Sequence, residues 1–379
     1  MELCSPNQCL GCAACANICP HGAIAMAEDR QGVLLPRIDS GKCVECGLCA
    51  RVCPVLHPLA LHPQGDCLAA WSTDPELRKT AASAGVISQL SRLVLENGGV
   101  VFGTRYENGC LIFDRITDVS GIGRFQGSKY VHAHVGDAYS QVRDLLKAGR
   151  TVLFPGTPCQ IAGLRSFLGR DYDTLLTVDL LCHGVTTGRY LNDYLARRGI
   201  DRYDSVLFRG QQGQRLAVFR DGKLLHLEEK LLSPFYMAYV RGLQHRENCY
   251  SCPFASTNRC ADLTAGDFWG LERGSLRADL SGIPFPSLVL VNTEKGRRFL
   301  EQARIDWEER PMEEAMAGNG QLSRPCTRHP NRERFLESYE NGNYHAALKK
   351  SGFYRQFRKQ AVPYGIRLFL SRVKRAIIK

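Results

Sequence analysis

"CLGCAACANICP" spans residues 9–20, and "CVECGLCARVCP" spans residues 43–54 with the same cysteine spacing. Both stretches read C-x2-C-x2-C-x3-C-P, and each cysteine of the second repeat lies 34 residues after its counterpart in the first. In this spacing three close thiolates bind one [4Fe-4S] cluster, and the fourth cysteine reaches the other cluster. The repeats therefore predict a first thiol set and a second thiol set. The first set is Cys9, Cys12, Cys15 and Cys53, and the second is Cys43, Cys46, Cys49 and Cys19.

A pair of structural zinc sites is the alternative interpretation of these eight cysteines. Zinc sites also use four cysteines, but normally as two C-x2-C pairs separated by a longer loop. Three cysteines followed by x3-C-P fit that arrangement poorly. Residues 1–58 also resemble bacterial two-cluster ferredoxins, including the Gly22-Ala23-Ile24 stretch after the first repeat. We therefore expect a ferredoxin-like domain with two [4Fe-4S] clusters over residues 1–58, and Cys4, outside the pattern, is interpreted as a spare surface thiol.

The whole chain has the composition of a globular protein, with 379 residues of which 44% are hydrophobic. No apolar run approaches the ~20 residues of a membrane-spanning helix, and the amino terminus lacks the pattern of a signal peptide. We therefore expect a cytoplasmic protein. Eight of the seventeen cysteines have metal-ligand spacing, so we expect thiolates kept reduced for metal binding rather than disulfides.

The net charge of +11 is concentrated at the C-terminal end of the chain. Residues 346–379 contain ten Lys and Arg and no Asp or Glu, which leaves 39 basic and 38 acidic residues in residues 1–345. Because the body is neutral, nucleic-acid binding is not expected.

The stretch "YGIRLFLSRVKRAIIK" (364–379) predicts a basic amphipathic helix that begins after Pro363. Such a helix either packs on the protein itself or on a partner, or lies on an anionic membrane surface. The absence of acidic residues favours peripheral contact with the inner membrane surface.

Helical and strand-like patterns alternate after a proline-rich linker at residues 59–69. "SAGVISQLSRLVLENGG" (83–99) has apolar residues at helical spacing, and the next stretch, "VVFGTRY" (100–106), has the composition of a strand. Alternation of this kind predicts an α/β domain (α+β for the whole chain) with a largely parallel sheet. The expected parts of the body and tail are residues 70–165, 166–345 and 346–379.

Three short segments have the composition of anion-binding turns where predicted strands end and helices begin. Ser83 and Gly85 stand at a helix start, whose free N–H groups favour anions. Lys129 lies in "GSKY", and Thr157 lies in the strand-to-helix turn "FPGTPCQ". Ordinary turn chemistry also explains each of these segments, so none of them establishes a site on its own.

Four further cysteines form a second group in the body. Two are in loops, and two form the C-x2-C of "NCYSCPF". Four thiolates from such segments can converge on a third [4Fe-4S] cluster, although scattered cysteines are often buried as small hydrophobic residues instead. Cys260 competes for the place of fourth ligand, and Cys67, Cys110 and Cys326 are interpreted as incidental.

Seven segments resemble, in the same order, the signatures of the coenzyme F420 hydrogenase/dehydrogenase beta-subunit family. They are "SAGVISQL", "VFGTRY", "GSKYVHA", "VLFPGTPCQIAGL", "VDLLCHGV", "NCYSCPF" and "ADLTAGDFWG". The resemblance extends from about residue 70 to about residue 293, and "GTPCQIAGL", "CHGV" and "GDFWG" are its most specific pieces. Ala84 departs from the family, which more often has a second glycine there.

The resemblance implies a flavoprotein with FAD, a [4Fe-4S] cluster beside the flavin, and a site for a deazaflavin or another two-electron acceptor. The cluster ligands that it implies, called the third thiol set below, are Cys159, Cys182, Cys249 and Cys252. The flavin contacts that it implies are Ser83, Gly85, Ser128, Lys129 and Thr157. It also implies two catalytic candidates near the reaction site, His183 and Asp267.

We therefore expect an oxidoreductase that passes single electrons from a ferredoxin-like donor through its clusters to FAD. The flavin would then reduce or oxidise an organic substrate or a deazaflavin coenzyme by two electrons. One alternative is an electron-transfer subunit of a larger complex, and another is an iron–sulfur regulatory or scaffold protein without flavin. A flavin spectrum tests the last alternative, and turnover by the lone chain separates the other two.

Overall fold

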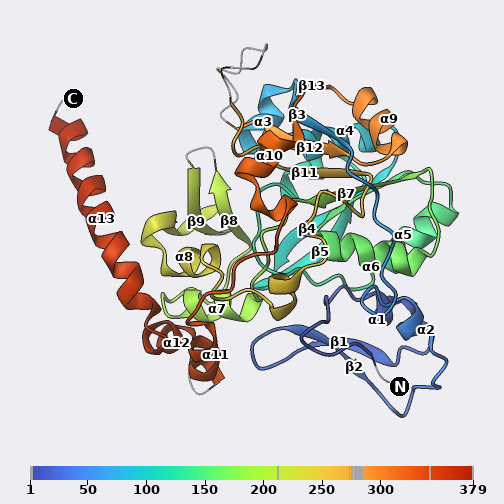
Figure 1. Ribbon diagram of the computed structural model, residues 1–379, viewed down its shortest axis with the longest axis horizontal. Coiled ribbons are helices and arrows are strands. Elements are labelled where there is room, and N and C mark those ends of the chain that lie inside the picture. The colour runs from blue at the N-terminus through green and yellow to red at the C-terminus, as the bar shows by residue number, and fades with distance from the viewer. Residues whose placement is uncertain are drawn as a thin grey trace.

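The structure is a computed structural model that describes residues 3–210, 213–272, 274, 276, 285–340 and 343–377. Figure 1 shows an amino-terminal segment beside a larger body, and a long C-terminal helix that leaves the body. Within the described ranges, no helix combines the length and the apolar composition that crossing a membrane requires.

The amino-terminal segment contains a hairpin and two short helices. Strands β1 (Ile24–Glu28) and β2 (Leu34–Ile38) are antiparallel, and helices α1 (Ala14–Ile18) and α2 (Leu48–Arg51) contact one another. The residue before each helix has a left-handed backbone, with φ values of 61° and 77°. The two sequence repeats therefore have the same local structure.

The body is built on one mixed sheet. Among the described residues its strand order is β13-β3-β12-β11-β7-β6-β4-β5. In chain order these strands are β3 (Asp66–Ser72), β4 (Val100–Glu107), β5 (Cys110–Ile116), β6 (Val152–Gly156), β7 (Leu175–Leu180), β11 (Leu263–Asp267), β12 (Ser287–Val291) and β13 (Ile305–Glu309). The neighbours β11, β7, β6 and β4 are parallel, and the outer pairs are antiparallel. The α/β prediction is confirmed, but the expectation of a largely parallel sheet holds only for these four central strands.

Two features of the connections explain why the sheet is mixed. Strand β5 returns from β4 through the two-residue turn Asn108-Gly109, whose φ values of 50° and 76° are typical of a tight hairpin. Strand β12 is antiparallel to both β11 and β3, so β3 points in the same direction as the parallel group. The Asn-Gly turn is visible in the sequence, whereas the pairing of β3 with β12 and β13 joins opposite ends of the body.

The strands β3, β11, β7, β6 and β4 therefore all end at the same side of the sheet, which we call the carboxyl edge. Ligands of α/β sheets commonly bind there, because loops and helix N-termini follow the strand ends. Segments that leave this edge are where a site is expected.

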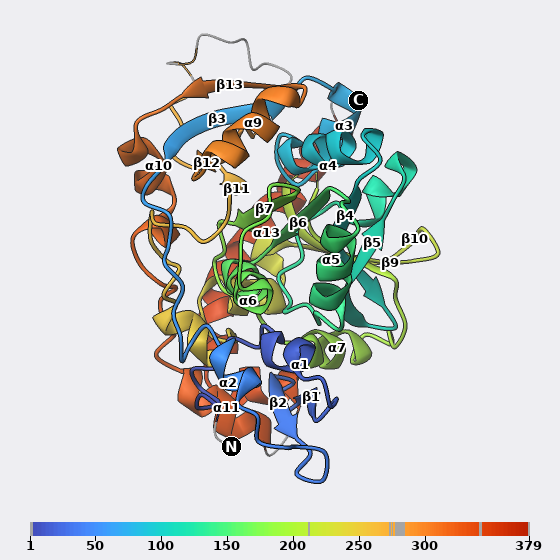
Figure 2. The ribbon, with the colours of Figure 1, turned by 90° about the vertical axis from the view of Figure 1, so that its right-hand side faces the viewer.

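Helices cover both faces of the sheet (Figure 2). They are α4 (Val86–Glu96), α5 (Ala138–Lys147), α6 (Pro158–Leu168) and α9 (Glu294–Gln302). Neighbouring residues of a strand point to opposite faces. Leu153 of β6 accordingly packs in the buried cluster that contains α4 and α9, and Phe154 packs in the cluster that contains α5 and α6.

A second, antiparallel sheet of order β10-β9-β8 lies beside the main one. Its strands are β8 (Ser205–Gly210), β9 (Gly213–Arg220) and β10 (Lys223–Glu229). Further helices are α3 (Pro75–Thr80), α7 (Gly188–Ala196), α8 (Pro234–Val240), α10 (Met312–Gly318), α11 (Arg332–Glu340) and α12 (Tyr344–Lys350). Short 3-10 helices are η1 (Val119–Arg124), η2 (Lys230–Leu232), η3 (Glu247–Ser251) and η5 (Gly320–Leu322).

The C-terminal helix α13 (Phe353–Ile377) starts ten residues before Pro363 and continues through it. The expected start after Pro363 is therefore wrong. Phe353 and Phe357 are buried against the body, and this packing sets the first turns of the helix. The predicted apolar face falls mainly on residues 368–379, and the side chains of these residues are outside the part that the structure describes. Ile366, the first residue of that face, is 56% exposed.

Candidate functional site

The cysteines of the two repeats line two separate hollows in the amino-terminal segment. All four residues of the second thiol set line one hollow, and all four of the first set line the other. The hollows have similar empty volumes, about 330 and 360 Å³ including space open to solvent. The crossed assignment, in which each repeat lends its fourth cysteine to the other, agrees with this grouping.

Cys4 also lines the hollow of the first thiol set and is only partly exposed. Its Sγ lies 3.9 Å from Cys53 Sγ, and a hydrogen bond with Cys4 lowers the pKa of Cys9 to about 7. The interpretation of Cys4 as a spare surface thiol therefore does not agree with its position. Its place in the sequence, five residues before the first repeat, is the one signal that it lies nearby.

Backbone N–H groups point at sulfur in both hollows. Gly11 N donates to Cys9 Sγ at 3.4 Å, and Ala23 N donates to Cys19 Sγ at the same distance. Hydrogen bonds to sulfur are one means by which proteins set the reduction potentials of iron–sulfur clusters. Within the described residues no three His, Cys, Asp or Glu side chains converge on a point that suits a single metal ion. Each hollow is lined by four repeat cysteines, which is the number of thiolates that binds a [4Fe-4S] cluster.

The first thiol set touches the body through α1 and α6. A Cβ placed on Gly163 of α6 would lie 2.6 Å from Cys12 Cβ and 2.9 Å from Cys12 Sγ. Burial raises the pKa of Cys12 well above its ordinary value, and the thiols of Cys15, Cys9 and Cys159 raise it further. Cys159 occupies the first turn of α6, so one short helix joins the first thiol set to the third.

The third thiol set is brought together from three segments: Cys159 lies in the first turn of α6, Cys182 follows β7, and Cys249 and Cys252 lie in and directly after η3. Burial raises the pKa of Cys182 well above its ordinary value, and Cys249, Cys159 and Cys252 all raise it further through their charge. Burial likewise raises the pKa of Cys252 to about 12, with contributions from Cys159 and Cys249. Cys326, interpreted as incidental, also lies here, and its Sγ donates to Cys249 O at 3.2 Å.

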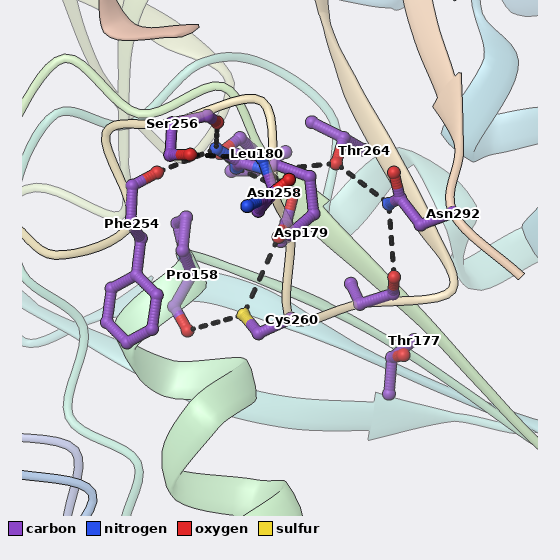
Figure 3. A network of polar contacts seen from close by, with 12 residues as sticks. Pro158, Thr177, Asp179, Leu180, Phe254, Ser256, Asn258, Cys260, Thr264 and Asn292 are labelled. Carbon is purple, nitrogen blue, oxygen red and sulfur yellow. Dashed lines mark hydrogen bonds and ion pairs between the residues drawn. The ribbon is translucent and has the colours of Figure 1, made fainter. Parts of the chain in front are cut away.

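Cys260 takes part in a different buried network, which Figure 3 shows. Its thiol donates to Pro158 O at 3.2 Å and lies 3.6 Å from Asp179 Oδ2. Arg259 Nη2 pairs with Asp179 Oδ1 at 2.8 Å, and Arg259 also donates to Phe254 O at 2.8 Å. This network ties the loop after Cys252 to the end of β7, and the Cys260 sulfur already has its own partners in it.

The residues expected to contact flavin lie in segments near the carboxyl edge. Gly85 precedes α4 with φ 81°, and Ser83 Oγ accepts a hydrogen bond from Ser287 Oγ at 3.1 Å. Thr157 precedes α6, and its Oγ1 lies 3.1 Å from Cys159 Sγ. Among the described contacts no hydrogen bond links Ser83, Lys129 and Thr157 to one another.

Lys129 and Ser128 lie in the loop that follows η1. Lys129 Nζ donates to the carbonyls of Phe125 and Gln126, both at 2.9 Å, and burial lowers the pKa of its ammonium to about 8. Gln126 Nε2 donates to Ser88 Oγ of α4 at 3.1 Å, which holds this loop against α4. Ser128 O accepts from Phe208 N at 3.4 Å, so the same loop also meets β8.

The two catalytic candidates lie at the ends of the neighbouring strands β7 and β11. His183 packs against Trp269, with ring centroids 5.2 Å apart, and burial, reinforced by the charge of Lys230, lowers its pKa to about 4. Asp267 is the last residue of β11 and pairs with Arg209 of β8.

Arg209 is the residue of this edge that sequence reasoning missed. It is buried, it pairs with Asp267, and its guanidinium lies 4.6 Å from the ring centroid of Phe285. Its strand belongs to the second sheet, which the sequence pattern did not predict, so no sequence signal placed it at the site.

Comparisons with known proteins give two regional matches. Residues 149–314 match the family model for the C terminus of the coenzyme F420 hydrogenase/dehydrogenase beta subunit, and residues 8–56 match the model for a 4Fe-4S dicluster domain. No curated protein matches the chain.

Among solved structures, the chain is similar to one from the F420-reducing [NiFe] hydrogenase complex of Methanosarcina barkeri. The identity is 16% and the TM-score 0.43, with 79% of this chain and 94% of that chain covered. The division of the body at residue 165 stays a prediction. On the two family matches, the chain contains a 4Fe-4S dicluster domain and a region similar to the C terminus of the coenzyme F420 hydrogenase/dehydrogenase beta subunit, which together support a role in electron transfer as an oxidoreductase.

Proposed function

We propose that the chain is an FAD-dependent oxidoreductase with three [4Fe-4S] clusters. It takes single electrons from a ferredoxin-like donor and exchanges two electrons with an organic substrate or a deazaflavin coenzyme. Bound flavin supplies the step between one-electron and two-electron chemistry. The contact between Cys12 and Gly163 is the main support for this proposal. It places the first thiol set against α6, the helix whose first turn contains Cys159 of the third thiol set.

The exposure of the thiols supports an order for the electron path. In the second thiol set Cys46 is exposed, and Val44 beside it is 59% exposed. In the first thiol set Cys9 and Cys12 are buried, and Cys12 faces the body. We therefore assign the second thiol set to the contact with an external donor and the first to the transfer into the body.

The donor set near the carboxyl edge fits the diphosphate of FAD by its chemistry. Hydroxyl groups, an ammonium group and two helix N-termini are the groups that proteins commonly use for phosphate. We assign these roles to Ser83 and Gly85 before α4, Ser128 and Lys129 after η1, and Thr157 before α6. His183 and Asp267 are assigned to the substrate side, where Trp269 and Arg209 contact them.

Flavin content tests this assignment. We expect about one FAD for each anaerobically purified full-length chain. Lys129→Met should bind FAD about ten- to a hundredfold more weakly, because a hydrogen bond to a charged group contributes about 1.5–3 kcal/mol. Lys295→Met is the control for loss of a buried ammonium group outside the assigned flavin segments; Lys295 donates to Tyr172 O at 3.1 Å and pairs with Asp262 Oδ1 at 3.2 Å. A chain without flavin, or equal affinity in both variants, contradicts the assignment.

We further propose that α13 attaches the protein to an anionic membrane surface. Figure 1 shows the helix leaving the body, and Val362 and Ile366 are both exposed. Residues 346–379 contain ten basic and no acidic residues. Each basic residue near such a surface contributes up to about 1 kcal/mol.

Flotation with vesicles tests the proposal for α13. The full chain should float with vesicles rich in anionic lipid and lose this binding at high salt. A chain ending at Ala361 keeps Phe353 and Phe357 packed but lacks five basic residues, and it should stay at the bottom of the gradient. Equal flotation of both chains, or binding that ignores salt and lipid charge, would rule out the helix as the anchor.

A further inference from the structure

Arg246 is a buried cation between the amino-terminal segment and the body. Its side chain is 2% exposed. Its Nη1 donates to Leu10 O at 2.6 Å, and its Nη2 donates to Cys9 O at 3.0 Å. The residue lies three positions before Cys249, whose backbone N donates to Arg246 O at 3.0 Å. Arg246 therefore joins the backbone of the first thiol set to the segment that carries Cys249 of the third.

The charge of Arg246 meets only neutral groups among its described hydrogen-bond partners. These are two backbone carbonyls and His132, whose ring lies 3.0 Å from Nη1. Burial lowers the pKa of His132 well below its ordinary value, so this ring is uncharged. Arg246 Nε is buried without a described partner. A buried cation without a counter-charge costs several kcal/mol, which predicts that negative charge is present when the site is loaded.

The guanidinium also packs directly on the loop between Cys9 and Cys12. A Cβ placed on Gly11 would lie 2.6 Å from Nη1 and 2.7 Å from Nη2 of Arg246. Gly11 has φ 63°, a left-handed conformation that favours glycine. The position is therefore specific to glycine for two reasons, and the close contact fixes the distance between the guanidinium and the first thiol set.

Hydrogen bonds place Arg246 beside both thiol sets. Its guanidinium donates to the carbonyls of Cys9 and Leu10 in the first thiol set's loop, and its own carbonyl accepts from the backbone N of Cys249 in the third thiol set. Arg246 is thus near enough to both thiol sets to act on negative charge in either.

We infer that Arg246 is a positioning residue that fastens the Cys9–Cys12 loop to the body and whose charge raises the reduction potentials of the two clusters on either side of it. The inference rests on the proposed third cluster. Reduction adds one electron to a cluster, and a fixed cation nearby stabilises the more negative, reduced form. No described hydrogen bond of Arg246 reaches the second thiol set, so we expect the charge to have a smaller effect there.

Redox titration followed by electron paramagnetic resonance tests the inference on the full-length chain with its clusters loaded. In Arg246→Gln, which removes the charge, the reduced-to-oxidised ratio at a fixed potential should fall about tenfold for the first and third clusters. A tenfold change equals about 59 mV for a one-electron couple. The ratio of the second cluster should change less. Arg246→Lys, which keeps the charge, should stay within about threefold of the unsubstituted chain.

Arg189→Gln is the matched control. Arg189 also joins the body to the amino-terminal segment, through Glu28 Oε2 at 3.1 Å, but it is exposed and has a carboxylate partner. This variant should leave all the ratios unchanged.

Unchanged ratios in a fully loaded Arg246→Gln chain would overturn the inference, and so would equal shifts in the Gln and Lys variants. If the Gln variant does not bind its clusters, the Lys variant, which keeps the charge, should still bind them. If neither variant binds its clusters, the inference that the charge matters is overturned. If iron analysis finds two clusters only, the third cluster fails as part of the proposed function. The titration of the first cluster still decides the role of Arg246.

Discussion

Replacing Cys249 and Cys252 together by serine should lower the iron content of the anaerobically reconstituted chain from about twelve to about eight atoms. The structure brings these two thiols together with Cys159 and Cys182, and each of the four is at least partly buried. Three of these thiols lie close enough to Cys182 to raise its pKa, and such a group suits a cluster, because bound iron compensates the negative charge that otherwise accumulates. Loss of two ligands should remove the whole cluster.

Cys260→Ser is the control for this experiment. The Cys260 sulfur is buried, but it donates to Pro158 O and lies beside Asp179 rather than among the other four thiols. Its replacement should leave about twelve irons. About eight irons in the unsubstituted chain, or loss of iron in the Cys260 variant alone, would sink the proposed ligand set.

Arg259→Met should lower the free energy of unfolding by about 3–5 kcal/mol, because it leaves the Asp179 carboxylate buried without its partner. Arg259 and Asp179 have side chains that are 1% and 0% exposed, and they pair at 2.8 Å (Figure 3). Denaturant unfolding of the loaded full-length chain measures the change. Removing the same positive charge from the surface would cost far less.

The double variant Asp179→Leu with Arg259→Met separates an unpaired charge from general damage to the core. Replacing both partners of a buried pair by apolar residues is often nearly neutral, so most of the lost stability should return. If the double variant is as unstable as the single one, the packing around Cys260 and Thr264 matters more than the ion pair. The buried pair would then not be what holds this loop.

The amino-terminal domain was predictable because its information is local. The cysteine spacing within each 12-residue repeat predicts which thiols share a cluster. The two hollows are lined by the same two sets of four cysteines that this spacing predicts. The α/β body was predictable from alternating helical and strand patterns. Its mixed sheet was not, because β3 pairs with β12 and β13 from the far end of the body.

The parts of the site that sequence reasoning missed depend on contacts between distant segments. Arg246 acts on Cys9, 237 residues away along the chain, and nothing in the stretch around Arg246 indicates that contact. Arg209 reaches Asp267 from a strand of the second sheet. Cys4 differs from these residues, because it lies close to the first repeat in the sequence as well as in space. It is absent from the predicted thiol sets only because it does not match the spacing of the repeat.

The most direct test of the account is rapid anaerobic mixing of the oxidised, fully loaded chain with a reduced ferredoxin. Absorbance of the clusters should bleach first, and the flavin should follow with two electrons for each chain. In Cys43→Ser with Cys46→Ser, which removes the exposed cluster, the flavin should be reduced at least about tenfold more slowly. Equal flavin reduction with and without that cluster, or no flavin to reduce, would contradict the claim that the clusters supply a flavin in the same chain.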